Sequence, residues 1–226
     1  MFDLTGKHAL VTGASGGIGG AIARALHAQG ARVALSGTRA DALKALADEL
    51  GEGAVPAPAD LARADGAETL AKAAEAALGG VDILVNNAGL TRDQLAVRMS
   101  DEDWQQVLDV NLTAAFRLAR ACLRPMMKAR WGRIIGIASV VGVTGNPGQA
   151  NYAASKAAMI GMSKALAQEV AKRGITVNCI APGYITTPMT EGLTDEQAES
   201  LLGRIPAGRL GEPADVAAAC VFLASD

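Results

Sequence analysis

The sequence predicts an α/β fold in which a doubly wound parallel sheet forms a single domain over residues 1–226. Short β-type runs alternate with longer helical runs, the pattern of a parallel sheet with right-handed crossovers. Half of the residues are hydrophobic and 26 are glycine, which suits helices packed closely on a sheet. A closed barrel of alternating strands and helices needs about eight such units, more than this chain contains.

The N-terminal half predicts strand–helix units in succession. Each strand is a short apolar run, and each helix repeats apolar residues at helical spacing. The third strand carries Pro56 and Pro58. Because proline cannot donate to a ladder hydrogen bond, we expect this strand at an edge of the sheet. In chain order the predicted elements are Lys7–Thr12, Gly17–Gln29, Arg32–Ser36, Ala40–Leu50, Ala54–Ala59 and Ala64–Leu78.

The C-terminal half continues the alternation with longer helices. The long helical stretch is expected to break near Val110, and the last helix has Pro213 in its first turn, where proline is tolerated. The polar segment Thr186–Gly203 is expected to form a loop with a short helix that closes over the substrate. The predicted elements are Val81–Val85, Asp101–Arg130, Arg133–Ala138, Ala150–Lys172, Ile175–Ile180 and Pro213–Leu223.

Composition argues against several classes of partner and location. A formal net charge of −2 gives no indication of nucleic-acid or membrane binding. The N-terminus has an early acid and no apolar run, so no signal peptide is expected, and no stretch approaches the length of a membrane span. Cys122, Cys179 and Cys220 are expected to be reduced core residues of a cytoplasmic protein. His8 and His27 lack partners at metal-ligand spacing, so no metal site is expected.

A glycine-rich turn joins the first predicted strand to its helix, with the sequence TGASGGIG over residues 12–19. Glycines permit a tight turn and close backbone approach, and the helix N-terminus offers free amides to a pyrophosphate. Between a strand and a helix, this turn favours a dinucleotide site of the Rossmann type over an ordinary loop. The residues expected to bind the cofactor here are Gly13, Ser15, Gly17, Ile18 and Gly19.

The end of the second strand predicts which nicotinamide cofactor is bound. An acid at this point binds the ribose hydroxyl of NAD, whereas a base accepts the phosphate of NADP. Residues 35–39 contain no acid, and Arg39 is placed to form paired hydrogen bonds with a phosphate. The alternative is a solvated arginine at a helix start. We expect NADP(H).

Other candidates follow the remaining strands. Asp60 offers a carboxylate to the adenine amino group, and the segment after the last strand is expected to line the nicotinamide pocket. Asparagine and glycine also favour turns for purely structural reasons. Because the carboxyl ends of parallel strands meet at one edge, where open sheets bind ligands, the candidates point to one site. They are Asp60, Asn87, Gly89, Pro182, Gly183 and Ile185.

Tyr152 and Lys156 are the candidate proton-transfer pair. Four residues apart on a helix, they share one face. A phenol normally has a pKa near ~10, and a cation beside it is expected to lower the pKa and make Tyr152 a usable acid or base. Ser139 is placed to share a substrate oxygen with the phenol, which suits reduction of a ketone or oxidation of an alcohol. An isolated pair of this kind is more often a solvated surface pair, so the interpretation depends on the other motifs.

Asn111 interrupts a helical run, where its amide competes with helix hydrogen bonds. A kink at this point would leave a carbonyl free to hold a water for proton relay. We therefore add Asn111 to the candidate catalytic residues.

Taken together, these residues resemble the short-chain dehydrogenase/reductase family over nearly the whole chain. Residues 86–93, 148–156 and 204–211 are most similar to members that reduce 3-oxoacyl groups on acyl-carrier protein. The resemblance implies NADPH-dependent reduction of 3-oxoacyl thioesters in fatty-acid synthesis. It also implies that Tyr152 donates the proton, Lys156 lowers its pKa and binds the nicotinamide ribose, Ser139 orients the carbonyl and Asn111 holds the relay water.

The resemblance also implies partners. Carrier protein would dock near the active-site mouth on Arg130 and Arg173, although arginines near helix ends are often only solvated. Members of the family are usually homotetramers built on the helices that contain Asn111 and Tyr152. In two respects the chain departs from the pattern: Gly16 stands where many NADPH-dependent members have a base, and the final strand that normally follows Asp226 is absent.

Without that strand, Ile175–Ile180 would be an exposed apolar edge. We therefore expect either that the chain is incomplete or that this edge is covered differently. Two other functions stay open from the sequence. One is reduction of acetoacetyl-CoA or another ketone by the same residues. The other is a non-catalytic nucleotide-binding subunit, for which the absent strand is the only support, since no catalytic residue is missing.

Overall fold

The strands form one parallel sheet. The computed structural model describes residues 2–186, 202–203 and 205–226. Its six strands are ordered β3-β2-β1-β4-β5-β6 and every neighbouring pair is parallel. The order reverses between β1 and β4, which is the point where open α/β sheets bind ligands. The strands are β1 (His8–Val11), β2 (Arg32–Leu35), β3 (Ala54–Pro56), β4 (Ile83–Asn86), β5 (Gly132–Ile137) and β6 (Ile175–Ile180).

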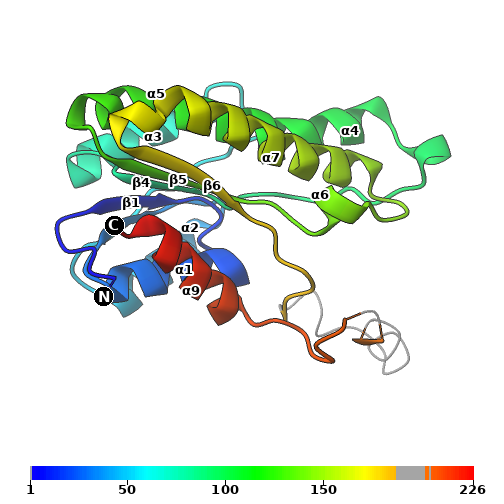
Figure 1. The fold of residues 1–226 in the computed structure, drawn as a ribbon, viewed down its shortest axis with the longest axis horizontal. Coiled ribbons are helices and arrows are strands. Elements are labelled where there is room, and N and C mark those ends of the chain that lie inside the picture. The colour runs from blue at the N-terminus through cyan, green and yellow to red at the C-terminus, as the bar shows by residue number, and fades with distance from the viewer. Residues whose placement is uncertain (1, 187–201, 204) are drawn as a thin grey trace.

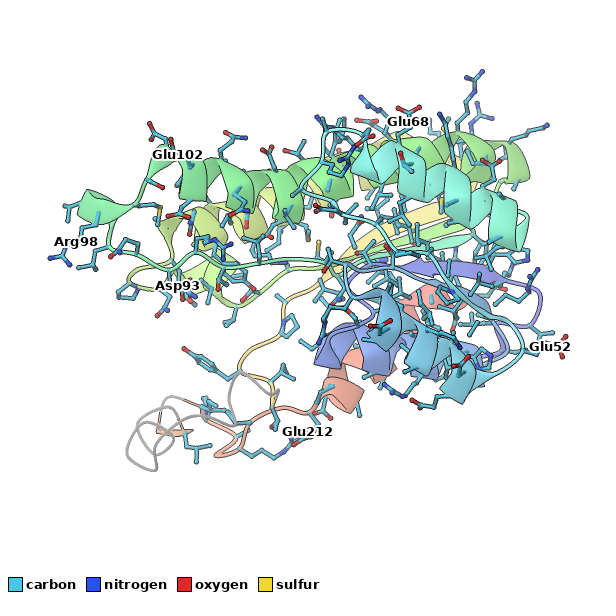
Figure 2. The ribbon with its side chains drawn as sticks, turned by 180° about the vertical axis from the view of Figure 1, so that it is seen from behind. Glu52, Glu68, Asp93, Arg98, Glu102 and Glu212 are labelled. Atoms are coloured by element: carbon cyan, nitrogen blue, oxygen red, sulfur yellow. The ribbon has the colours of Figure 1, made fainter. Side chains whose placement is uncertain are left out.

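Helices cover both faces of this sheet, as Figure 1 shows. One layer holds α1 (Gly17–Ala28), α2 (Ala40–Leu50) and α9 (Pro213–Ala224), and both chain ends lie on this side. The other layer holds α3 (Gly66–Leu78), α4 (Asp101–Leu108), α5 (Ala114–Ala129) and α7 (Ala150–Val170). Figure 2 shows the same layers from behind. Short helices η1 (Ala96–Arg98), α6 (Val141–Thr144) and η3 (Ala171–Arg173) complete the connections.

The core divides into two clusters, one on each side of the sheet. Ala9 and Val11 of β1 pack with the layer of α1 and α9, whereas Leu10 between them packs with the layer of α3 and α5. Successive side chains of a strand point to opposite faces, and here both faces are covered. This is why the central strands read as continuous apolar runs rather than as alternating ones.

Most predicted elements are confirmed within a few residues. β3 lies at a sheet edge as predicted, but it ends at Pro56 instead of Ala59. The predicted break near Val110 is a π-helical turn, η2 (Asp109–Thr113), between α4 and α5. Helices η1 and α6 are absent from the prediction because three or four residues carry no helical periodicity.

β6 is the other edge of the sheet within the part of the chain that the structure describes. The edge position agrees with the sequence analysis, and the apolar side chains at the start of β6 are covered by helices. Ile175 and Val177 are 2% and 6% exposed, because they pack beneath α5 and α7, while Thr176 between them is exposed. The predicted closing loop, residues 186–203, lies outside the described residues except at 186, 202 and 203. None of the helices described is long and apolar enough to cross a membrane.

Candidate active site

The predicted site residues gather at the carboxyl edge of the sheet. They follow β1 at the glycine turn, β2 at Arg39, β3 at Asp60, β4 at Asn87, and β5 and β6 at Ser139 and Pro182. In Figure 1 this edge lies to the right, where α6 and the first turn of α7 stand beside the strand ends. One edge of one sheet therefore carries both the cofactor-binding and the catalytic candidates.

In the glycine turn, the backbone at Gly13 packs closely against the backbone at Gly19. Gly13 has φ +66°, a conformation that favours glycine. A Cβ on Gly19 would lie 2.2 Å from the Gly13 carbonyl oxygen, so no other residue fits there without a shift. Among the described residues no side chain caps α1. The amides of Gly17, Ile18 and Gly19 precede the first helical bond, from Gly20 N to Gly16 O, and are available to an anion.

Thr12 fastens this turn to the end of β4. Its Oγ1 accepts hydrogen bonds from the amides of Asn87 and Ala88, both 2.9 Å, and donates to Val85 O at 3.1 Å. The Asn87 side chain returns a bond from Nδ2 to Thr12 O at 2.8 Å. Thr12 is not among the candidate residues predicted from the sequence, because its hydroxyl meets the end of β4 only in the packed structure. Asn87 acts in the structure as a support of the turn.

Arg39 lies against the glycine turn, as the cofactor prediction requires. Its Nη2 donates to the carbonyl oxygen of Ser15, and the side chain is exposed. Asp60 is held nearby, since Ala59 N donates to Gly37 O at 3.0 Å. The Asp60 carboxylate is exposed and accepts the Ala62 amide at 2.9 Å. Its second oxygen is left for a ligand.

Ser139 and the segment after β6 lie side by side. Val140 N donates to Pro182 O at 2.9 Å, which places Pro182 beside Ser139. Ser139 is 8% exposed, and its Oγ accepts the Val141 amide at 3.2 Å. Gly183 is exposed, and Ile185 forms an isolated parallel bridge with Gly211. The chain beyond β6 is thereby held against the catalytic edge.

Lys156 is buried beside Tyr152, the predicted proton donor. It is 4% exposed, its Nζ donates to Ile137 O at 2.7 Å, and Nζ lies 5.6 Å from the centre of the Tyr152 ring. Burial lowers the pKa of Lys156 to about 8. Gly89 faces the same ammonium, 3.5 Å from where its Cβ would lie. Lys156 is therefore buried and Tyr152 half-buried, so the two do not form a solvated surface pair.

The pKa of the Tyr152 phenol is raised, so the expectation that the neighbouring Lys156 lowers it is wrong. Burial raises the pKa of Tyr152, a hydrogen bond with Ser139 acts in the opposite direction, and the negative charge of Asp93 raises it further. The physical reason is desolvation, which disfavours the phenolate more strongly than the neighbours favour it. In this geometry the tyrosine holds its proton firmly.

Asn111 lies in the π-helical turn η2 and is 1% exposed. Its Oδ1 accepts the Leu90 amide at 2.9 Å, and its Nδ2 donates to Leu90 O at 3.0 Å and to Ser155 Oγ at 3.1 Å. The side chain thus ties the loop after β4 to η2 and α7. The sequence prediction missed Ser155 and Asn151, although both flank the Tyr152–Lys156 pair in the same run.

Arg130 and Arg173 do not lie at the active-site mouth of their own chain. Arg130 follows α5 and precedes β5, and Arg173 precedes β6, so both stand at the amino edge of the sheet. Arg130 Nη2 donates to Lys172 O at 3.1 Å, which joins the two segments. The expected position is wrong because residues before and after a strand lie at opposite edges.

The site fits a dinucleotide. Gly13 and Gly19 let the turn close tightly, no described side chain caps the amides at the start of α1, and Arg39 supplies a cation at the end of β2. Elsewhere in the described ranges, no three His, Cys, Asp or Glu side chains form a possible metal site.

Known proteins are similar to this chain over most of its length. Residues 7–198 match the short chain dehydrogenase family. Nodulation protein G of Rhizobium sp. (strain N33) is 62% identical over 226 residues, covering 100% of this chain and 92% of that protein. The 3-oxoacyl-[acyl-carrier-protein] reductase FabG of Escherichia coli (strain K12) is 52% identical over 224 residues, covering 99% and 92%.

A solved structure is also close. It is assigned as an NAD(P)-dependent gluconate 5-dehydrogenase from Beutenbergia cavernae, with NADP bound at low occupancy. Its TM-score is 0.94 at 45% identity, covering 100% of this chain and 92% of that one. Sequence similarity over this length and the same arrangement of strands and helices lead to one conclusion. The chain belongs to the short chain dehydrogenase family.

Proposed function

We propose that this protein is a cytoplasmic, single-domain reductase that uses NADPH to reduce 3-oxoacyl thioesters of acyl-carrier protein to 3-hydroxyacyl thioesters, a step of fatty-acid synthesis. The observation that carries the proposal is the half-buried Tyr152, whose pKa is affected by Ser139 and whose ring centre lies 5.6 Å from the ammonium of the buried Lys156. The similarity to 3-oxoacyl-[acyl-carrier-protein] reductases at 52% to 53% identity supports the choice of substrate.

The geometry suits proton donation to a ketone. Ser139 and Tyr152 together present two hydroxyl donors to one carbonyl oxygen. The raised pKa keeps the proton on the Tyr152 phenol until that oxygen gains negative charge. Lys156, with a pKa of about 8, is largely cationic at neutral pH and stabilises the phenolate that remains after transfer.

NADPH supplies the hydride that the carbonyl carbon accepts, while the carbonyl oxygen takes the phenol proton. The residues proposed to hold the cofactor are Gly13, Ser15, Gly17, Ile18, Gly19, Arg39, Asp60, Asn87, Gly89, Tyr152, Lys156, Pro182, Gly183 and Ile185. Preference for the phosphorylated cofactor rests on Arg39, since Gly16 adds no charge to the turn. We also propose that the Asn111 backbone, distorted by η2, holds a relay water.

The test is NADPH oxidation with acetoacetyl-carrier protein and acetoacetyl-CoA, compared with NADH. We expect a preference for NADPH and for the carrier-bound substrate. Tyr152→Phe should lower kcat at least about 100-fold, because it removes the acid. Retained NADPH binding, measured by fluorescence, serves as the control. A Tyr152→Phe variant with near wild-type kcat would overturn the proposal.

A different ketone substrate is the second candidate. The solved structure assigned as a gluconate 5-dehydrogenase, at 45% identity, favours it. Acetoacetyl-CoA is another alternative substrate, because it presents the same 3-oxo group without a carrier protein. Faster turnover of either compound than of acetoacetyl-carrier protein would replace the proposed substrate while leaving the catalytic residues in place.

We propose that carrier protein docks on Arg130 and Arg173 and that the enzyme is a homotetramer. Both arginines are exposed, and the bond from Arg130 to Lys172 O brings their segments together. Two adjacent cations suit an acidic partner. Since these arginines stand at the amino edge, the thioester would reach the catalytic edge of another subunit rather than that of the same chain.

A further inference from the structure

Ser155 lies in the contact between α7 and the π-helical turn η2. It is 0% exposed, its Oγ donates to the carbonyl oxygen of Tyr152 at 2.7 Å, and the same Oγ accepts from Asn111 Nδ2 at 3.1 Å. A single buried hydroxyl therefore connects the peptide group of the proton donor with the amide of Asn111.

Asn151 makes the matching connection on the other side of Tyr152. It is also 0% exposed, its Oδ1 accepts the Tyr152 amide at 2.7 Å, and its Nδ2 donates to Arg92 O at 3.0 Å. The Tyr152 amide belongs to the first turn of α7, where helices leave amides without helical partners. Buried side chains thus hold both the N–H and the C=O of Tyr152.

Both connections end on the same loop. Asn151 reaches it at Arg92 directly, and Ser155 reaches it at Leu90 through Asn111, whose Oδ1 and Nδ2 bind the Leu90 amide and carbonyl. This loop begins at Gly89, which faces Asn111 and the Lys156 ammonium. A movement of the loop after β4 would therefore also move the backbone of Tyr152.

Ser155 also shapes the helix between the catalytic residues. A serine hydroxyl that bonds to a carbonyl one turn back competes with the regular helix bond and bends the axis slightly. Tyr152 and Lys156 lie on either side of this bond, so it influences the separation of phenol and ammonium. Without the hydroxyl, the Asn111 amide also loses one of its two acceptors and is held only by the Leu90 backbone.

We propose that Ser155 is a positioning residue for the reaction, acting through Tyr152 and Asn111 without touching the substrate. The inference rests on the proposed function. It predicts that loss of the Ser155 hydroxyl reduces the rate of the chemical step while leaving ground-state binding nearly intact, because the site is assembled but its proton donor is displaced.

Ser163 provides a matched control on the same helix. It is 5% exposed, and its Oγ accepts a bond from Cys179 Sγ at 3.1 Å. Ser163→Ala therefore removes one buried hydroxyl from α7, as Ser155→Ala does. Among the described contacts, its side chain reaches neither Tyr152 nor Asn111, so a merely structural effect of losing a hydroxyl appears in both variants.

The experiment measures kcat and KM with acetoacetyl-carrier protein, the Kd of NADPH and the thermal unfolding midpoint for wild type, Ser155→Ala and Ser163→Ala. We expect Ser155→Ala to lower kcat about tenfold, the effect of one neutral hydrogen bond, with KM and Kd within about threefold of wild type. Ser163→Ala should keep wild-type kcat, with a similar shift in midpoint.

The double variant Asn111→Ala/Ser155→Ala adds a second readout. If Ser155 acts through Asn111, the double variant should lose little more kcat than Asn111→Ala alone, because the two residues form one unit. If Asn111→Ala does not fold, the comparison of the two serine variants decides.

If the wild type is active and Ser155→Ala has the same kcat, the inference is overturned but the proposed function is not. Equal losses of kcat in Ser155→Ala and Ser163→Ala have the same meaning. A wild type that binds NADPH but does not reduce the thioester overturns the proposed function and this inference with it.

Discussion

Tyr152 and Lys156 owe their acid–base properties to burial more than to charge. Desolvation is the largest influence on both pKa values, and it acts in opposite directions, raising that of the phenol and lowering that of the ammonium to about 8. Each shift favours the uncharged form. For a reductase this arrangement keeps the proton on the donor, and it makes the lysine a group that titrates close to physiological pH.

The lowered pKa of Lys156 predicts a pH dependence of stability. The folded pKa of about 8 lies below the ordinary 10.5, so the unfolded chain binds the extra proton between these values. The free energy of unfolding of the wild type therefore rises with pH through this window. Replacing Lys156 by Met removes the buried charge, so the variant should be more stable than wild type at pH ~7 by about 2 kcal/mol.

That difference should shrink as the pH rises above about 8, where the wild-type lysine becomes neutral. Urea unfolding of both proteins at pH ~7, ~8 and ~9 measures it. Buried Cys122 and Cys220, whose pKa values are raised to about 12, oppose the trend above the ordinary thiol range, but equally in both proteins. A stability difference that does not change with pH would contradict the prediction.

At the scale of elements, the cofactor site depends on how β1 and β4 are joined at their carboxyl ends. Thr12 and Asn87 exchange bonds across the switch point of the sheet, and Gly13 and Gly19 close the turn above them. The π-helical turn η2 has a similar role beneath the catalytic residues, where it directs Asn111 to the loop after β4. The site is built at the ends of strands and helices. Such elements hold side chains more precisely than loops do.

We predict that Thr12→Val weakens both the fold and NADPH binding. Valine matches the shape of threonine but removes the acceptor of the Ala88 amide and leaves the Asn87 amide with Val85 O alone. The expected loss of stability is about 1 to 3 kcal/mol, from one part-buried amide left unsatisfied. Thr12→Ser keeps the hydroxyl and is the control. Urea unfolding and an NADPH titration measure the two effects, and equal behaviour of Val and Ser variants would show that the hydroxyl has no such role.

At the scale of the whole molecule, the proposed docking residues and the catalytic residues lie at opposite edges of the sheet. β5 has six residues and is therefore about 20 Å long, with Arg130 before its start and Ser139 after its end. A carrier protein on Arg130 and Arg173 would serve another subunit of the proposed tetramer. The partner subunit would thus complete the site for carrier-bound substrates, but not for substrates in free solution.

Mixed oligomers test this arrangement. Tyr152→Phe retains the docking arginines, and Arg130→Glu/Arg173→Glu retains the catalytic residues. Alone, the first should be inactive, and the second should reduce acetoacetyl-CoA but be at least about tenfold slower with acetoacetyl-carrier protein. Co-expressed and purified through two different tags, the mixed oligomer should recover activity with carrier protein. No recovery, with activity on acetoacetyl-CoA intact, would indicate docking and catalysis within one chain.

The sequence by itself determined the order of the elements, the edge position of β3 and the set of candidate residues at the strand ends. These follow from local information: apolar periodicity, prolines in β3, glycines between a strand and a helix, and the spacing of Tyr152 and Lys156. The family resemblance added substrate and cofactor. These features can be predicted from the sequence because each depends only on residues nearby in the chain.

Only the tertiary structure decided how these residues behave together. The direction of the Tyr152 pKa, the position of Arg130 away from the mouth and the connection from Ser155 to Asn111 depend on contacts between distant segments. Ser155 and Asn111 are 44 residues apart, and no local pattern brings them together. Burial and desolvation are properties of the packed molecule, and only packing brings the candidate residues together at one edge of the sheet.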